Sequence, residues 1–121
     1  MEDLRAQQKE ALQVLVEYSP KLIRAMKAVV EELRVNRQPD TDEYLLSIVK
    51  GMNWEIEIFN LTKDYINESE ERMDKEAFNQ VILQFNDAYT GKDDLKMAEL
   101  LEGEALAVFE KLEEIAKELS V

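Results

Sequence analysis

The clearest pattern of apolar and polar positions lies in the last stretch of the chain, from Asp93 to Leu119. Apolar residues recur there at alternating steps of three and four, and charged residues, mostly glutamate, fill the positions between them. The apolar series is Ala98, Leu101, Ala105, Val108, Leu112, Ile115 and Leu119. Such alternation keeps one side of an α-helix apolar. A helix ~40 Å long, at ~1.5 Å per residue, cannot bury that side against itself, so the pattern predicts that other helices pack on it.

The same helical period runs through the start of the chain, from Glu2 to about Asn36. Its apolar positions are Leu4, Ala11, Leu15, Tyr18, Leu22, Met26, Val29 and Leu33. Pro20 interrupts this stretch, but the apolar series keeps its phase on both sides of the proline. We therefore predict one long helix that is kinked at Pro20.

Two more helices are predicted between these stretches. One opens at residues 40–42 and runs to about Asn67, and the other covers roughly residues 73–89. Gly91 is expected to close the latter in the left-handed conformation, and Gly51 suggests that another backbone approaches the former closely. No strand pattern interrupts the helical periods. The sequence predicts an all-α fold, a mostly antiparallel four-helix bundle that forms a single domain of residues 1–121.

The second predicted helix carries two apolar faces where a bundle helix needs one. The first face consists of Leu45, Ile48, Val49, Met52, Ile56 and Phe59, and the second of Trp54, Ile58, Leu61 and Tyr65. At 100° per residue the two faces point in nearly opposite directions. One hypothesis is that the second apolar face binds a second copy or a helix of a partner protein, since Trp and Tyr are enriched at such surfaces. The other is that the first helix folds over it at the kink.

The composition of the chain excludes several kinds of active site and binding partner. The 121 residues include no cysteine and no histidine, and the formal net charge is −12. The chain therefore has no thiolate, and it lacks the commonest general base and metal ligand, which a di-iron bundle would need. A surface this acidic repels nucleic acid and anionic lipid, so neither partner is expected. The first residues do not resemble a secretory signal, and no run approaches the ~20 apolar residues of a membrane span, so a cytoplasmic location is expected.

Carboxylates alone leave one enzymatic alternative, a magnesium-dependent nucleotide hydrolase. Asp40 with Glu43, and Glu71 with Asp74, form two pairs three residues apart, but both pairs lie near predicted helix ends and carry no flanking motif. A chain with three glycines has no glycine-rich phosphate loop. We therefore expect no catalytic residue, no metal ligand and no cofactor. The favoured function is protein–protein contact, through self-association or a partner helix.

Two resemblances bear on this hypothesis. The run from Phe85 to Glu102, FNDAYTGKDDLKMAELLE, followed by an acidic helix, resembles a family of small, uncharacterised, acidic helical-bundle proteins of Gram-positive bacteria. The segment Ser19-Pro20-Lys21-Leu22-Ile23, followed by a long helix, is similar to the first helix of flagellin export chaperones. The second likeness implies an alternative function, the binding of an amphipathic helix of an exported protein. Neither implies a reaction or a cofactor.

Overall fold

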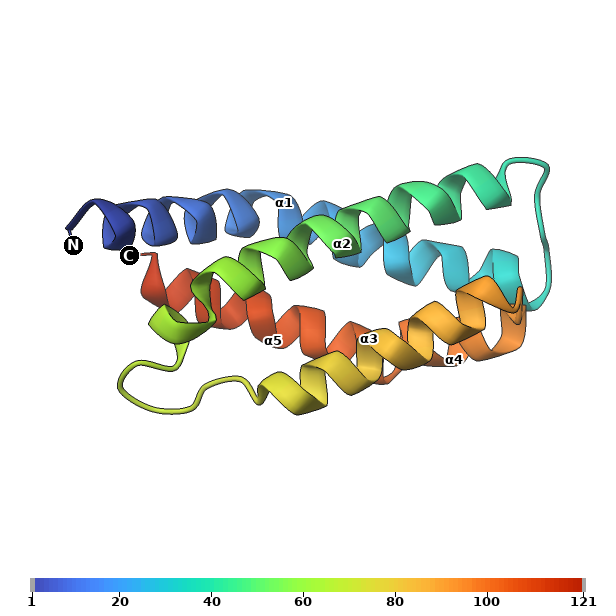
Figure 1. The fold of residues 1–121 in the computed structure, drawn as a ribbon. Coiled ribbons are helices and arrows are strands. Elements are labelled where there is room, and N and C mark those ends of the chain that lie inside the picture. The colour runs from blue at the N-terminus through green and yellow to red at the C-terminus, as the bar shows by residue number, and fades with distance from the viewer. Residues whose placement is uncertain (1, 121) are drawn as a thin grey trace.

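A computed structural model describes residues 2–120, and within this range every regular element is an α-helix. Helix α1 spans Glu2–Arg34, α2 spans Thr41–Ile66 and α3 spans Lys75–Thr90; the last arm consists of α4, Asp94–Glu102, and α5, Glu104–Leu119. The helices thus form four arms, and Figure 1 shows that they alternate in direction, which brings both ends of the chain to the same end of the bundle. The predicted all-α, antiparallel four-helix bundle is confirmed.

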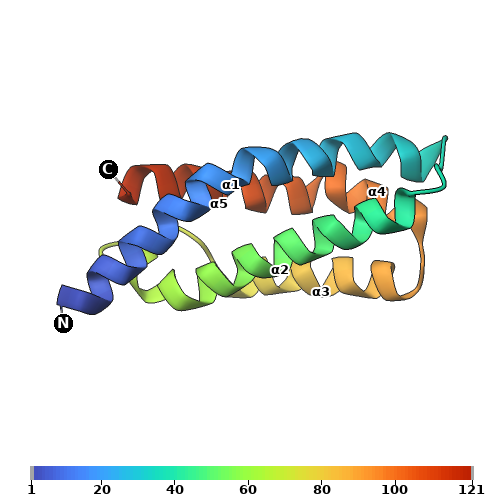
Figure 2. The ribbon, with the colours of Figure 1, turned by 90° about the horizontal axis from the view of Figure 1, so that it is seen from above.

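Helix α1 is continuous through Pro20 and bends, as the sequence predicts. Proline has no N–H to donate to the Val16 carbonyl, and its ring crowds that carbonyl, so the helix axis turns there. Figure 2 shows the result: the first half of α1 crosses toward the end of α2, and the second half runs along α4 and α5. One helix therefore packs against α2 and against both helices of the last arm, α4 and α5.

The turn between α3 and α4 differs from the prediction. Gly91 was expected to be left-handed, but its φ is −79°, and the left-handed residue is Lys92, with a φ of 54°. The Asp93 N–H donates to the Ala88 carbonyl and the Lys92 N–H donates to the Tyr89 carbonyl. These two bonds form a Schellman motif. Its left-handed residue is Lys92, one position later in the chain than the predicted Gly91. The predicted start of this helix is also corrected: Asp74 caps it, so Met73 is buried outside the helix.

The last arm is not the single helix that the apolar series from Ala98 to Leu119 predicted, because it breaks at Gly103. This glycine has φ −110° and ψ −106°, values outside the helical region. Phe109, which the predicted apolar series left out, is fully buried, while Val108, which the series contained, is only half-buried. Phe109 follows the buried Ala105 by four residues and precedes the buried Leu112 by three, so the same helical period accounts for its position.

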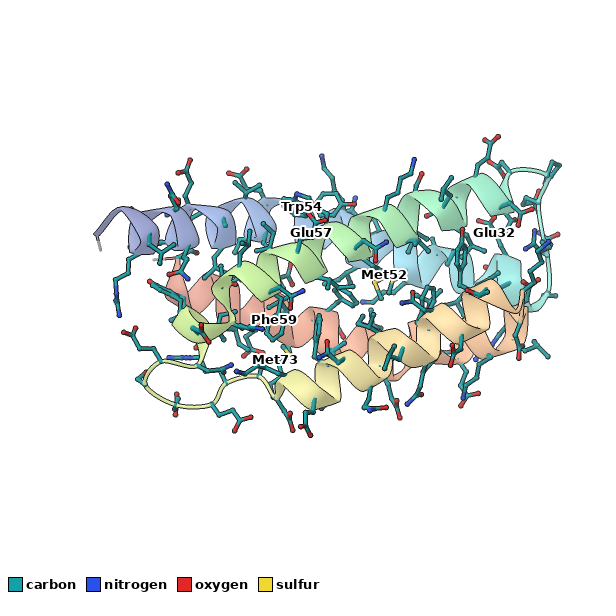
Figure 3. All side chains as sticks on the ribbon, in the orientation of Figure 1. Glu32, Met52, Trp54, Glu57, Phe59 and Met73 are labelled. Carbon is teal, nitrogen blue, oxygen red and sulfur yellow. The ribbon has the colours of Figure 1, made fainter. Side chains whose placement is uncertain are left out.

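Phenylalanine rings fill the centre of the bundle. The ring centroids of Phe59 and Phe78 lie 4.5 Å apart, and those of Phe78 and Phe109 lie 5.9 Å apart. These contacts join α2, α3 and α5 through aromatic side chains that bury large apolar areas. Figure 3 shows Phe59 between α2 and α3, and Trp54 on the side of α2 that faces α1.

Candidate interaction surface between α1 and α2

The second apolar face of α2 is divided between packing and solvent. Ile58 is buried, with 9% of its surface exposed, and Leu61 is open to solvent, with 68% exposed. Trp54 and Tyr65 are half-buried against α1. The four residues that the sequence grouped together therefore lie along the junction of α1 and α2, and Leu61 extends beyond it.

Two aromatic contacts hold α1 against this face. The Tyr18 ring meets the Trp54 ring edge-on, with centroids 5.2 Å apart and planes at 78°. Near the start of α1, the Arg5 guanidinium lies 5.5 Å from the centre of the Tyr65 ring, which is a cation–π geometry. The Gln8 side-chain amide also donates to the Leu61 carbonyl, at 3.0 Å. The first half of α1 is thus fixed along the C-terminal half of α2.

Gly51 makes the close crossing of the two helices possible. A Cβ at this position would overlap the Tyr18 hydroxyl and lie 3.1 Å from Cδ1 of Leu22. The sequence suggested that a backbone approaches Gly51, but the approaching group is the Tyr18 side chain. The absent side chain on α2 leaves room for this tyrosine, and Tyr18 in turn supports Trp54.

A shallow groove opens above this crossing. Its volume is about 460 Å³, and its walls, mostly apolar, are Val14, Tyr18, Ser47, Lys50, Gly51 and Trp54. Val14 is 44% exposed on the α1 side, and Trp54 closes the α2 side. We call this feature the α1–α2 groove. It is an apolar recess on a chain whose net charge is −12.

Directly behind the groove lies a buried polar pair that the sequence analysis missed. Ser19 on α1 and Glu55 on α2 are both 0% exposed, and the Ser19 hydroxyl donates to Oε2 of Glu55 at 3.1 Å. The other carboxyl oxygen, Oε1, is buried without a hydrogen-bond partner among the described residues. Burial raises the pKa of Glu55 to about 8, against the lowering effect of the Ser19 bond, and the charge of Glu113 adds to the rise. Glu55 is consequently a neutral acid over most of the range below pH 8.

The signal for Glu55 was present in the spacing of the chain. The buried positions of α2 follow steps of four and three, and Glu55 takes the central step of that series: Thr41, Leu45, Ile48, Met52, Glu55, Phe59, Thr62 and Ile66. A search for apolar residues at these steps does not select a glutamate, so it leaves Glu55 out of the predicted core. The position, rather than the residue type, identifies it as part of the core.

The carboxylates named for a magnesium site lie far apart. Asp40 and Glu43 lie at the start of α2, and Glu71 and Asp74 lie beyond its end, in the connection to α3. The intervening helix of 26 residues is ~39 Å long, so the two pairs occupy opposite ends of the bundle. Among the side chains of residues 4–120, no cluster of three or more acidic groups is arranged to hold a metal ion.

Comparison with known proteins places the chain in a family by sequence. A family model described as a domain of unknown function, DUF8042, matches residues 10–115. No curated protein and no solved structure matches the chain. Within the described residues, no helix combines the length and apolar character that crossing a membrane requires.

Proposed function

We propose that this chain, which belongs to the DUF8042 family, is a non-catalytic module that acts through protein–protein contact. The contact surface is the α1–α2 groove together with the exposed Leu61, and its occupant is an amphipathic helix. The observation that carries the proposal is an exposed, mostly apolar recess with two aromatic walls, Tyr18 and Trp54, on a strongly acidic chain.

The shape of the surface favours a helix as the occupant. Two adjacent helices present a long furrow, and a third helix can lay its apolar side along such a furrow. Exposed leucines extend the apolar surface along α2 on both sides of Trp54, from Leu46 to Leu61. This distance is ~22 Å at ~1.5 Å per residue, or about four helical turns.

The energetics of the recess support binding as well. Exposed apolar area stabilises a complex when it is removed from water, at ~25 cal/mol per Å². Tyr18 and Trp54 are already held in place by their edge-on contact, so binding would freeze few additional rotamers. Rigid aromatic side chains of this kind are typical anchors of protein interfaces.

The emission of Trp54 provides a direct test, because it is the only tryptophan in the chain. The probe is a synthetic helix of about 18 residues with leucines at steps of three and four and with lysine and glutamate elsewhere. We expect this peptide to change the Trp54 emission with a micromolar Kd. Val14→Glu should weaken binding about tenfold or more, by placing a charge in the groove.

A matched control lies on another face of the bundle. Leu83 on α3 is also exposed, at 56%, and Leu83→Glu introduces the same charge away from the groove. This variant should bind the peptide like the wild type. The proposal fails if the peptide leaves Trp54 emission unchanged up to ~1 mM, or if Val14→Glu and Leu83→Glu bind it equally well.

A further inference from the structure

The solvent-facing side of α2 carries four residues whose spacing is symmetric about one point, with a leucine at each end and two opposite charges between them. Leu46, Lys50, Glu57 and Leu61 lie on this side, and all four are exposed. Take the point between Asn53 and Trp54 as the centre. Leu46 precedes this centre by as many residues as Leu61 follows it, and the same holds for Lys50 and Glu57.

This symmetry is what an antiparallel contact between two identical helices requires. In such a pair a two-fold axis passes through the centre, so each residue faces the residue at the mirrored position of the other helix. Leu46 of one copy then faces Leu61 of the other, and Lys50 faces Glu57. Each contact occurs twice, which gives two leucine pairs at the ends and two opposite-charge pairs between them.

We propose that the helix bound at this surface is α2 of a second copy of the same chain, antiparallel and centred between Asn53 and Trp54. This inference rests on the proposed function and names its partner. The second α2 lies along the edge of the α1–α2 groove, in contact with Trp54 and Lys50 of the first. By symmetry the first α2 lies along the groove of the second copy.

Charge explains why a chain with a net charge of −12 can pair with itself here. The strip between the two leucines contains one lysine and one glutamate, so it is locally neutral. Neither Lys50 nor Glu57 forms an ion pair with any side chain among residues 4–120, so both are available to a second copy. Beyond the leucines the same register would place Glu43 opposite Asp64, a repulsive pair, so the contact is confined to Leu46–Leu61.

Charge reversal tests the register in the full chain by sedimentation equilibrium. We expect a wild-type dimer with a micromolar Kd. Lys50→Glu makes both charge pairs Glu–Glu, and Glu57→Lys makes both Lys–Lys, so each variant should weaken dimerisation about tenfold or more. The double variant K50E/E57K restores opposite charges and should dimerise like the wild type. An equimolar mixture of the two single variants should form a heterodimer, because all its pairs are again Glu–Lys.

Two controls reproduce the same changes of net charge elsewhere. Lys111 and Glu110 are exposed on α5, and Lys111→Glu and Glu110→Lys should leave the dimer unchanged. The inference is overturned if the double variant stays as weak as the singles, or if the controls weaken the dimer equally. It is also overturned if the wild type is a monomer up to ~1 mM. If the wild type is a monomer but still binds the synthetic helix, the proposed function stands and only the dimer is excluded. If it also fails to bind the synthetic helix, both the proposed function and the dimer are excluded.

Discussion

Ser19 and Glu55 join the bend of α1 to the middle of α2 by one hydrogen bond of 3.1 Å, with both side chains fully buried. Ser19 immediately precedes Pro20, so the bonded group lies at the bend of the helix. The neutral acid is the favoured form of Glu55, because a buried charge with one unpartnered oxygen would be costly. The interior of the bundle therefore contains one group that titrates near neutral pH.

Stability should fall as the pH rises from about 5 to 8. The pKa of Glu55 is about 8 in the folded chain, against 4.5 for an exposed glutamate, so the folded state binds this proton more tightly. By linkage, the stabilising contribution is fully present below pH 4.5 and is lost as the pH rises through 8. The loss is on the order of 5 kcal/mol, at ~1.36 kcal/mol per pKa unit. Urea unfolding followed by circular dichroism across this range measures it.

Glu55→Gln provides the control for this pH dependence. Glutamine keeps the shape of the side chain and cannot ionise, so the variant should show a nearly flat stability between pH 5 and 8. The comparison is clean because the chain has no histidine, the side chain that usually titrates in this range. Parallel curves for the wild type and the variant would show that Glu55 is not the titrating group.

Removal of the Ser19 hydroxyl should destabilise the chain most at high pH. Ser19→Ala leaves the Glu55 carboxylate without its hydrogen bond, at a cost of ~1–3 kcal/mol for an unsatisfied buried group. The bond lowers the pKa of Glu55, so its loss should raise that pKa further and extend the pH-dependent fall above pH 8. In the Glu55→Leu background the serine has no carboxyl to bond, and Ser19→Ala should then cost less. An equal cost in both backgrounds would mean that the two residues are not coupled.

Gly51→Ala should destabilise the wild-type fold, but it should be neutral or stabilising when residue 18 is smaller. The new methyl group would overlap the Tyr18 hydroxyl, and such overpacking costs ~1–3 kcal/mol, which outweighs the ~1 kcal/mol gain in helix propensity. Tyr18→Phe removes the overlapping oxygen, so in that background the alanine should be neutral or stabilising. Thermal unfolding of the wild type, the two single variants and the double variant measures this difference. A stabilising Gly51→Ala in the wild type would contradict the close contact.

The sequence was sufficient to predict the architecture because the bundle depends on long apolar stripes. The alternation of three and four steps survives in all four arms, and the phase across Pro20 correctly indicated one bent helix. The stripe could not show the break at Gly103, because glycine is tolerated inside a helix and signals a break only weakly. Phe109 was missed for a different reason: Val108 and Phe109 both fit steps of three and four between Ala105 and Leu112, and the folded chain buries Phe109.

The surface was harder to predict than the fold. The spacing of Trp54, Ile58, Leu61 and Tyr65 predicts a second apolar face of α2, but spacing alone cannot tell what covers it. The bend at Pro20 decides this, since it sends the first half of α1 toward the end of α2, where Ile58 is buried and Leu61 stays exposed. Glu55 was missed because an acidic residue was assumed to face water, although its step in the series is that of a core residue.

Lys92→Gly should stabilise the bundle by ~1 kcal/mol. Lys92 holds a φ of 54°, a conformation that costs a residue with a side chain ~1–2 kcal/mol and costs glycine little. Gly91→Ala is the matched control, because its φ of −79° suits alanine, and it should change stability by no more than ~0.5 kcal/mol. Chemical denaturation of the three chains at one pH measures both differences. If the left-handed residue were Gly91 instead, the results would reverse: Gly91→Ala would cost ~1 kcal/mol or more, and Lys92→Gly would bring no gain.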